Sequence, residues 1–402
     1  EGGWPNTLTL ALMSKRYFTM NKLLLGSMIF TVLFQSCAQQ TGSTVNGESD
    51  REEKEQAAID STITLSDFLQ ENEWLDSKVE KIFSTLDDTA VVAQLIMPAA
   101  GRLGSTESVI RDMIRKRIIG GVLMLNGTKE DFTNWIKGFE GLNDSIGNLP
   151  FLYSADAEPS LVNRKIIGST SVKKANELKT IEEVREVAEV ISKDLNAIGI
   201  NYNFSPVVDM SPNKTVGFRS FGAVPANIIP WSDAFIQQTQ KNNIIATAKH
   251  FPGHGLVSGD THQSLQVIDG ELKEIGNYPK LIENGVLSVM IAHIAVKNNP
   301  KYDTKGLPAS TSETIVTKLL RDEYGFKGLI VTDAMNMGGV ASIPQCEVKA
   351  VNAGVDIVLM PVNPSKAHGQ ILEKYRKDAE FKKKVDAAAK RVIRMKIALG
   401  LI

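Results

Sequence analysis

Eight short apolar segments, separated by amphipathic ones, constrain the fold more than any other feature of this sequence. The segments are residues 93–98, 120–126, 151–156, 200–209, 243–251, 286–294, 328–333 and 355–361. Most are continuous apolar runs, which is typical of strands that are buried on both faces of a parallel sheet. Strands of this kind that alternate with helices predict an α/β fold.

The stretch from Thr180 to Gly199 shows the helical part of this pattern. Thr180 and Glu183 have the spacing of a capping box, apolar residues follow at helical intervals, and Gly199 suits a helix C-terminus. Residues 385–400 have the same amphipathic character. Eight strands favour a single (β/α)8 barrel of the TIM type, and an open doubly wound sheet is the alternative.

Polar residues at the ends of the apolar segments favour the barrel. They are Asp156, Asp209, Lys249, His250, His293 and Asp333. A barrel gathers the C-terminal ends of its strands on one face, where its active site is built. Any one of these residues could simply mark a strand leaving the core. That explanation fits less well when carboxylates, histidines and a lysine recur on five separate segments.

The N-terminal region has the pattern of an export signal. Basic residues precede the apolar run 23–34, and Cys37 follows shortly after it. The run is too short for a membrane-spanning helix, which needs about 20 apolar residues. The pattern resembles a bacterial lipoprotein signal, which would make Cys37 the lipidated residue. An ordinary secretory signal is the alternative.

The chain is therefore expected to have three parts. Residues 1–36 form a signal peptide with a possible upstream extension before Met20, and polar residues 37–61 form a flexible tether. Residues 62–402 form one TIM-barrel domain. We expect an exported, membrane-anchored lipoprotein on the periplasmic or outer-membrane side, or a secreted protein. A net charge of −1 gives no reason to expect nucleic acid as a partner.

Three of the five histidines lie in one stretch, "KHFPGHGLVSGDTH", at residues 249–262. The possible metal ligands in it are His250, His254, Asp260 and His262. Zinc takes three or four such ligands, so a metal site is one interpretation. Barrel metallohydrolases usually add a His-x-His pair after the first strand, and this chain has none there. We therefore expect no metal.

Asp260 and His262 have a spacing that suits acid/base catalysis. In an extended segment, side chains two residues apart point the same way, so the carboxylate could hold one imidazole nitrogen while the other faces a substrate. An imidazole titrates near working pH and can donate and recover a proton. A surface loop that happens to contain both residues is the alternative.

Asp333 ends the segment "GLIVTD" and is the second candidate for chemistry. A carboxylate at the end of a buried strand can attack an electrophilic carbon or stabilise a developing cation. It could equally cap the N-terminus of the next helix, which is a common role for Asp.

Several motifs occur together along the chain: "NFSPVVDM", "FRSFG", "KHFPGHG" followed by "DTH", "VMIAHI", "RDEYGFKGLIVTD" with "TDAMNM", and "AGVDIVLMP". Together they resemble the family 3 glycoside hydrolases, and more narrowly their bacterial β-N-acetylhexosaminidase branch. The resemblance covers the chain from about residue 87 onward. It implies an enzyme that hydrolyses O-glycosyl compounds without a metal or other cofactor.

The resemblance also implies roles for individual residues. Asp333 matches the nucleophile of a retaining mechanism, His262 the general acid/base, and Asp260 its partner. The implied sugar-binding residues are Asp156, Arg164, Arg219, Lys249 and His250. The segment "DAEPSLVNR" departs from the family pattern, because Pro159 and Ser160 replace a glycine pair. The loop near the sugar is therefore expected to differ.

These inferences predict an exo-β-N-acetylglucosaminidase acting on terminal β-linked N-acetylhexosamine, for example in peptidoglycan fragments. A carbohydrate is the expected partner, no protein partner is predicted, and the membrane is contacted only through Cys37. A glycoside phosphorylase is one alternative, because a neutral imidazole repels phosphate less than a carboxylate does. The other alternative is a catalytically inactive, membrane-tethered glycan-binding protein. It rests on the replacement of the glycine pair by Pro159 and Ser160.

Overall fold

The computed structural model describes residues 63–402. The expected signal peptide, Cys37 and the tether over residues 37–61 lie outside the described residues. Within residues 63–402, no helix combines the length and apolar character needed to cross a membrane.

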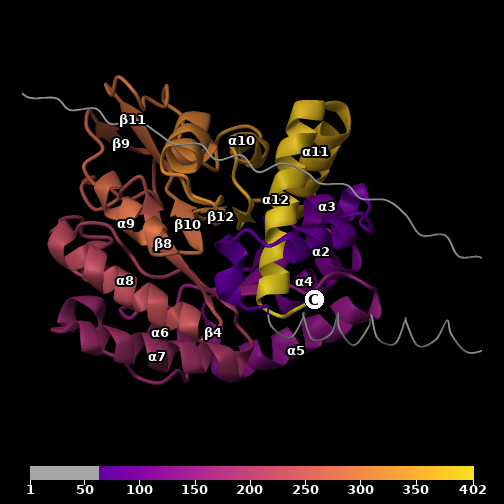
Figure 1. Ribbon diagram of the computed structural model, residues 1–402, viewed down its shortest axis with the longest axis horizontal. Coiled ribbons are helices and arrows are strands. Elements are labelled where there is room, and N and C mark those ends of the chain that lie inside the picture. The colour runs from indigo at the N-terminus through magenta and orange to yellow at the C-terminus, as the bar shows by residue number, and fades with distance from the viewer. Residues whose placement is uncertain (1–62) are drawn as a thin grey trace, which may run out of the picture. The chain divides into compact units, whose positions relative to one another are not determined.

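A curled parallel sheet forms the centre of the fold (Figure 1). Its strands in spatial order are β12 (Leu329–Thr332), β10 (Ser288–Ile291), β8 (Ile245–Phe251), β7 (Tyr202–Asn203), β5 (Leu152–Ala155), β3 (Gly121–Met124) and β2 (Ala99–Ala100). A further parallel pair joins β1 (Ile96–Met97) to β13 (Val358–Leu359). The predicted α/β class is confirmed, and each of the eight apolar segments contains one of these strands.

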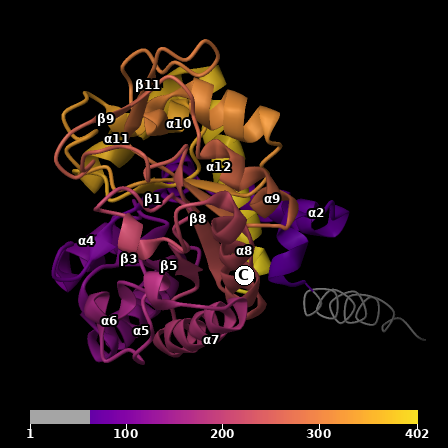
Figure 2. The same cartoon turned by 90° about the vertical axis from the view of Figure 1, so that its left-hand side faces the viewer.

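Helices follow the strands along the chain and lie around the outside of the sheet (Figure 2). They are α4 (Glu107–Arg115), α5 (Lys129–Ser145), α7 (Ile181–Ile198), α8 (Pro225–Lys241), α9 (Tyr278–Glu283), the π-helix η6 (Thr314–Glu323), α10 (Cys346–Asn352), α11 (Pro364–Lys377) and α12 (Ala379–Ala398). Before β1 lie η1 (Leu65–Leu69), α2 (Glu73–Phe83) and α3 (Asp88–Ala93).

The helix expected after Thr180 begins as predicted. The Thr180 side chain accepts a hydrogen bond from the Glu183 N–H at 3.2 Å, and Gly199 ends α7 with φ of +95°. The Glu183 carboxylate accepts the N–H of Lys179 at 2.7 Å, one residue earlier than a standard capping box requires. Glycine suits the left-handed conformation at position 199 because it has no Cβ.

The core lies on both faces of the sheet. An inner cluster takes side chains from every strand of the sheet and from β1 and β13, for example Leu152, Ile245 and Met290. Leu65 and Phe68 of η1 pack into the same cluster. A larger outer cluster fills the space between the sheet and its helices. The ends of the strands are therefore fixed on both sides by close-packed apolar side chains.

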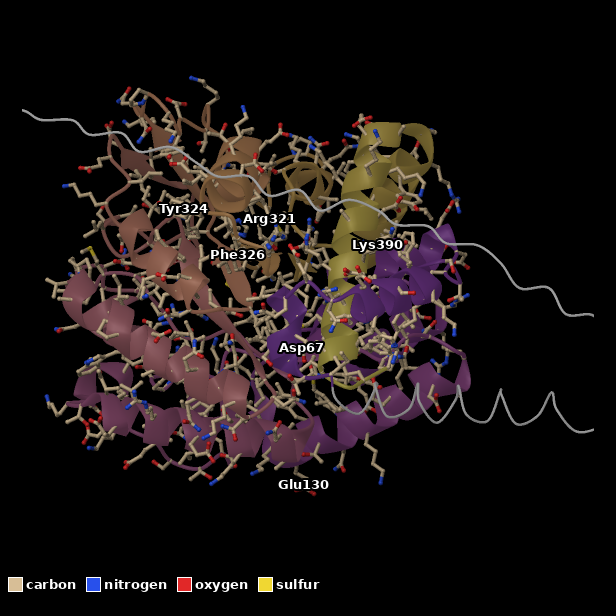
Figure 3. The ribbon with its side chains drawn as sticks, in the orientation of Figure 1. Asp67, Glu130, Arg321, Tyr324, Phe326 and Lys390 are labelled. Carbon is tan, nitrogen blue, oxygen red and sulfur yellow. The ribbon has the colours of Figure 1, made fainter. Side chains whose placement is uncertain are left out.

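A buried carboxylate ties the last helices to the sheet. Asp356 accepts the N–H of Ile330 at 2.7 Å and pairs with Arg391 of α12 at 2.6 Å. Arg321 of η6 also binds Asp356 and lies over the ring of Phe326, with 5.5 Å to the ring centroid (Figure 3). Each polar group of this cluster thus has a partner, as burial of polar side chains requires.

Candidate active site

A cavity of about 640 Å³ opens beside the C-terminal ends of the strands. The residues implied by the sequence that line it are Asp156, Arg164, Arg219, Lys249, His250, His262 and Asp333. Asp260 is absent from the lining, although its partner His262 is part of it. The fold therefore brings residues from several loops and strand ends, distant in sequence, to one place.

Two carboxylates and three cations form a charged network on one wall of the cavity. The Lys249 Nζ lies 2.9 Å from Asp156 Oδ1 and 2.5 Å from Glu158 Oε1. Arg219 donates two hydrogen bonds to Glu158, from Nε at 2.7 Å and from Nη2 at 2.6 Å. Lys165 donates to the second oxygen of Asp156 at 2.6 Å.

The network holds its members in their charged forms. Burial alone would raise the pKa of Asp156, but Lys165 and Lys249 bring it well below its usual range. For Glu158, burial is likewise outweighed by Arg219 and Lys249, which lower the pKa to about 2. This wall thus presents ionised groups, which make the stronger hydrogen bonds to ligand hydroxyls.

Pro159 and Ser160 form a turn that needs no glycine. The N–H of Leu161 donates to the carbonyl of Glu158 at 2.9 Å, which places Pro159 at the favoured second position of the turn. Neither residue has positive φ. The Ser160 hydroxyl donates to the carbonyl of Phe218 at 2.8 Å and accepts the N–H of Ala175 at 2.9 Å. The departure from the glycine pair thus gives an ordered turn joined to the Arg219 loop.

Arg164 follows this turn and lies at the rim of the cavity. Its side chain is exposed and makes no ion pair within residues 63–402. It differs in this respect from its neighbour Lys165, which is held by Asp156.

Asp209 and His250 form a buried pair, of which His250 lines the cavity and Asp209 lies behind it. The Nδ1 of His250 lies 2.6 Å from Asp209 Oδ2, and the same carboxylate accepts the N–H of His254 at 2.8 Å. Burial by itself would raise the pKa of Asp209, but His250 and His254 lower it. His254 in turn contacts the Thr261 hydroxyl through Nε2 at 2.9 Å. The imidazole rings of His250 and His254 therefore have separate partners.

Asp260 and His262 are paired, as predicted, at 2.7 Å between Oδ1 and Nδ1. The expectation of an extended segment was wrong, because residues 261–263 lie in a turn. The Asp260 carboxylate instead folds back and also accepts the N–H of His262 at 2.9 Å, as Asp commonly does in turns. Since Nδ1 is held by the carboxylate, Nε2 is the nitrogen left to meet a ligand in the cavity.

Asp333 follows β12 and is half-buried in the cavity wall. Its carboxylate accepts the N–H of Ala334 at 2.8 Å. Burial favours a raised pKa, but His250, His293 and this N–H lower it below the usual value. The helix-capping alternative is not supported, because the next helix, α10, begins only at Cys346. Asp333 is thus an ionised carboxylate in contact with the cavity.

The loops of His262 and Asp333 are joined by backbone hydrogen bonds. The N–H groups of Gly338 and Gly339 donate to the carbonyls of His262 and Thr261 at 3.0 and 3.1 Å. A Cβ on Gly338 would lie 2.3 Å from the Gln263 carbonyl oxygen, so the close approach requires glycine. His293 is buried nearby, and its Nε2 lies 3.0 Å from the Ala334 carbonyl.

Two members of the charged network, Glu158 and Lys165, were not assigned to the site from the sequence. The signal for both residues was weak, because each acts through a partner distant in sequence. A paired-carboxylate spacing, Asp156-x-Glu158 at a strand end, is the one pattern that could have indicated Glu158.

Comparison with known proteins relates this geometry to a family. Residues 85–395 match the Glycosyl hydrolase family 3 N terminal domain. A Beta-hexosaminidase of Methylobacillus flagellatus is 32% identical over 63% of this chain and 76% of its own length. A Beta-N-acetylglucosaminidase/beta-glucosidase of Cellulomonas fimi is 29% identical over 70% of this chain, which spans 53% of that protein.

A solved structure agrees with these matches. The family 3 β-N-acetylglucosaminidase of a Paenibacillus species superimposes with a TM-score of 0.72 and 26% identity. The superposition covers 79% of this chain and 63% of the Paenibacillus chain. The chain thus spans between about half and three quarters of the relatives described.

Proposed function

This chain belongs to glycoside hydrolase family 3 and is a glycoside hydrolase; we propose that it is a retaining exo-β-N-acetylglucosaminidase. The observation that carries the proposal is one cavity lined by both an ionised Asp333 and the imidazole of His262. The names of the relatives from Methylobacillus and Paenibacillus support the choice of N-acetylhexosamine as the sugar. Peptidoglycan fragments are a suitable source of such a terminal sugar.

In the first half of the reaction, Asp333 attacks the anomeric carbon as the bond to the leaving oxygen breaks. The positive charge that develops on the sugar ring is stabilised by this carboxylate until the covalent bond forms. The lowered pKa of Asp333 supports this role, because the attacking group must be ionised.

His262 supplies the proton that the leaving oxygen needs. The Nδ1–H of a protonated His262 donates a hydrogen bond to Asp260, so the proton given to the leaving oxygen is the one on Nε2. The neutral imidazole then removes a proton from water, whose oxygen attacks the anomeric carbon and displaces the Asp333 carboxylate. The product keeps the original anomeric configuration, and Asp333 and His262 return to their starting states.

The charged wall is suited to holding the sugar during both steps. Asp156 can accept hydrogen bonds from hydroxyls, while Lys249 and Arg219 can donate to them. Glu158 is fully buried and acts by holding Arg219 and Lys249 in place. Arg164 and His250 line the same space and complete the proposed sugar-binding set. Each interaction that tightens in the transition state lowers the barrier.

We further propose that the curled sheet and the β1–β13 pair form one closed (β/α)8 barrel. Only Pro98 separates β1 from β2 along the chain. At the other edge, the Thr332 N–H donates to the Ile357 carbonyl at 3.0 Å, just before β13. These contacts support a continuous ring of eight strands.

The proposed location rests on the sequence before residue 38. A lipid-anchored Cys37 would keep the domain on the membrane, whereas an ordinary signal would release it. Metabolic labelling with palmitate tests this directly. Label that is present in the full chain and lost in Cys37→Ala supports the anchor, and an unlabelled chain in the culture medium supports secretion.

A panel of aryl glycosides, assayed with and without phosphate, tests the activity. We expect release of the aryl group from the β-N-acetylglucosaminide, independent of phosphate. Asp333→Ala should lower this rate by about 10⁴-fold or more, while Asp322→Ala, an exposed position on η6, should not change it. Sugar 1-phosphate formed only with added phosphate would identify a phosphorylase. Binding without hydrolysis of any glycoside would identify a glycan-binding protein.

A further inference from the structure

A buried carboxylate outside the cavity supports the loop that carries the acid/base pair. We call residues 253–262 the acid/base loop. Glu274 is 3% exposed and follows the loop in the chain. Its Oε1 accepts the N–H of Met210 at 2.6 Å and of Gly255 at 3.2 Å, and its Oε2 accepts the N–H of Leu256 at 3.2 Å.

Two glycines of the acid/base loop, Gly253 and Gly255, pack closely against Glu274. A Cβ on Gly253 would lie 2.6 Å from both the Cβ and the Oε2 of Glu274. A Cβ on Gly255 would lie 2.6 Å from its Oε1 and 1.8 Å from the Met210 carbonyl oxygen. Distances this short are excluded by sterics, so the two glycines allow the loop backbone to reach the carboxylate.

Glu274 also joins the acid/base loop to Asp209. Met210, whose N–H it accepts, directly follows Asp209, and Asp209 holds the N–H of His254. Two buried carboxylates therefore bind consecutive backbone N–H groups at positions 254, 255 and 256. These hydrogen bonds fix the beginning of the acid/base loop, and His262 lies at its other end.

Further contacts extend this order toward His262. The N–H of Asn213 donates to the Gly255 carbonyl at 2.9 Å, and its side-chain amide donates to the carbonyls of Val257 at 2.5 Å and Gly259 at 3.1 Å. The His254 ring meets the Thr261 hydroxyl, next to His262. A polar contact or a covalent bond thus links each step from Glu274 to the acid/base pair.

We propose that Glu274 is a positioning residue for the proton-transfer steps, acting through the acid/base loop on His262. It does not line the catalytic cavity, so it has no contact with the sugar. The inference rests on the acid/base role proposed for His262. A loop that shifts by about 1 Å would misplace Nε2 relative to the leaving oxygen and slow proton transfer by as much as about 100-fold.

The test compares Glu274→Ala with Glu274→Gln on two substrates of the full chain. One is an N-acetylglucosaminide with a poor leaving group, such as phenol, and the other carries dinitrophenol. We expect Glu274→Ala to lower kcat/KM roughly 10- to 100-fold for the phenyl substrate and less than about 3-fold for the dinitrophenyl one. Glu271→Gln, exposed and without a polar contact to the loop, is the matched control.

Glu274→Gln should recover part of the loss. Its amide oxygen can accept the N–H groups of Met210 and Gly255, whereas its NH2 group only donates and cannot accept the N–H of Leu256. This variant also keeps the test usable if Glu274→Ala does not fold. Equal losses on both substrates in a folded variant would mean a merely structural role and would overturn the proposal.

A double variant separates this inference from the function on which it rests. In a His262→Ala background, Glu274→Ala should change the phenyl rate by less than about 2-fold, because two residues that act through one step are not additive. Full additivity would contradict the proposal. If His262→Ala alone shows no dependence on the leaving group, the acid/base assignment itself has failed.

Discussion

Two carboxylate–imidazole pairs involve the same stretch of chain, and they differ in burial rather than in contact geometry. The Asp209–His250 and Asp260–His262 pairs have nearly equal distances between Nδ1 and the carboxylate, 2.6 and 2.7 Å. The side chains of the first pair are 0% and 6% exposed, and those of the second are 31% and 61% exposed.

This difference in exposure suits the two pairs to different roles. In the buried pair, every change of protonation would place a charge or an unpaired donor in the interior, which is costly. That pair is suited to holding the backbone at positions 250 and 254. The exposed pair can gain and lose a proton to solvent or substrate at little cost, as an acid/base catalyst must.

The largest expected effect comes from removing the exposed imidazole. His262→Ala should lower kcat/KM for a phenyl glycoside by about 10²- to 10⁴-fold, because the leaving oxygen loses its proton donor. The loss for a dinitrophenyl glycoside should be far smaller. Gln263→Ala, exposed in the same turn, serves as the control. Equal losses on both substrates would remove the acid role from His262.

The second-largest expected effect is the loss in free energy of unfolding when the buried Asp209–His250 pair is removed. Asp209→Ala leaves the His250 ring and the N–H of His254 without their partner, and we expect it to lower the free energy of unfolding by about 3–5 kcal/mol. Asp260→Ala, in the exposed pair, should cost less than about 1 kcal/mol. Urea unfolding measures both values. Similar costs for the two variants would contradict the contrast in burial.

A smaller kinetic effect is expected from the partner of the acid/base residue. Asp260→Asn should lower kcat/KM for the phenyl substrate by roughly 10- to 100-fold, since an amide orients the imidazole less well and does not stabilise its charge. The overall structure should stay unchanged by circular dichroism. A rate equal to that of the unchanged protein would show that the pairing has no catalytic role.

The smallest effect is a pH dependence of stability. The pKa of Asp209 is lowered on folding, so the folded state binds fewer protons than the unfolded state near the usual Asp value of about 3.9. The pair therefore stabilises the fold above that pH, and this stability is lost as pH falls through the lower folded value. Asp209→Asn should flatten the loss of unfolding free energy below about pH 4, measured by urea titration at several pH values. An unchanged slope would contradict the assignment.

Local sequence patterns predicted most of the fold because the strands are continuous apolar runs. The segment at 200–209 shows the limit of this approach. Only Tyr202–Asn203 is a strand there, and Val207 makes isolated bridges instead. Pro206 has no N–H to donate, so a regular ladder cannot continue through it.

The parts of the site that the sequence did not predict depend on contacts between distant segments. Asp333 stands in a recognisable motif at the end of a strand segment, and His262 stands in one within the loop that follows β8. Glu274 follows a segment without a strong periodic pattern, and its role appears only when it meets Met210 and Gly255. Lys165 and Glu158 likewise take their roles from the charges that surround them after folding.

Trapping the covalent intermediate tests the central claim most directly. In His262→Ala, a dinitrophenyl N-acetylglucosaminide should glycosylate the enzyme quickly, while the water attack that follows is slow. Mass spectrometry of the quenched protein should show one added N-acetylhexosamine, and peptide mapping should place it on Asp333. An adduct on another residue, or turnover at the unchanged rate by Asp333→Ala, would contradict the account.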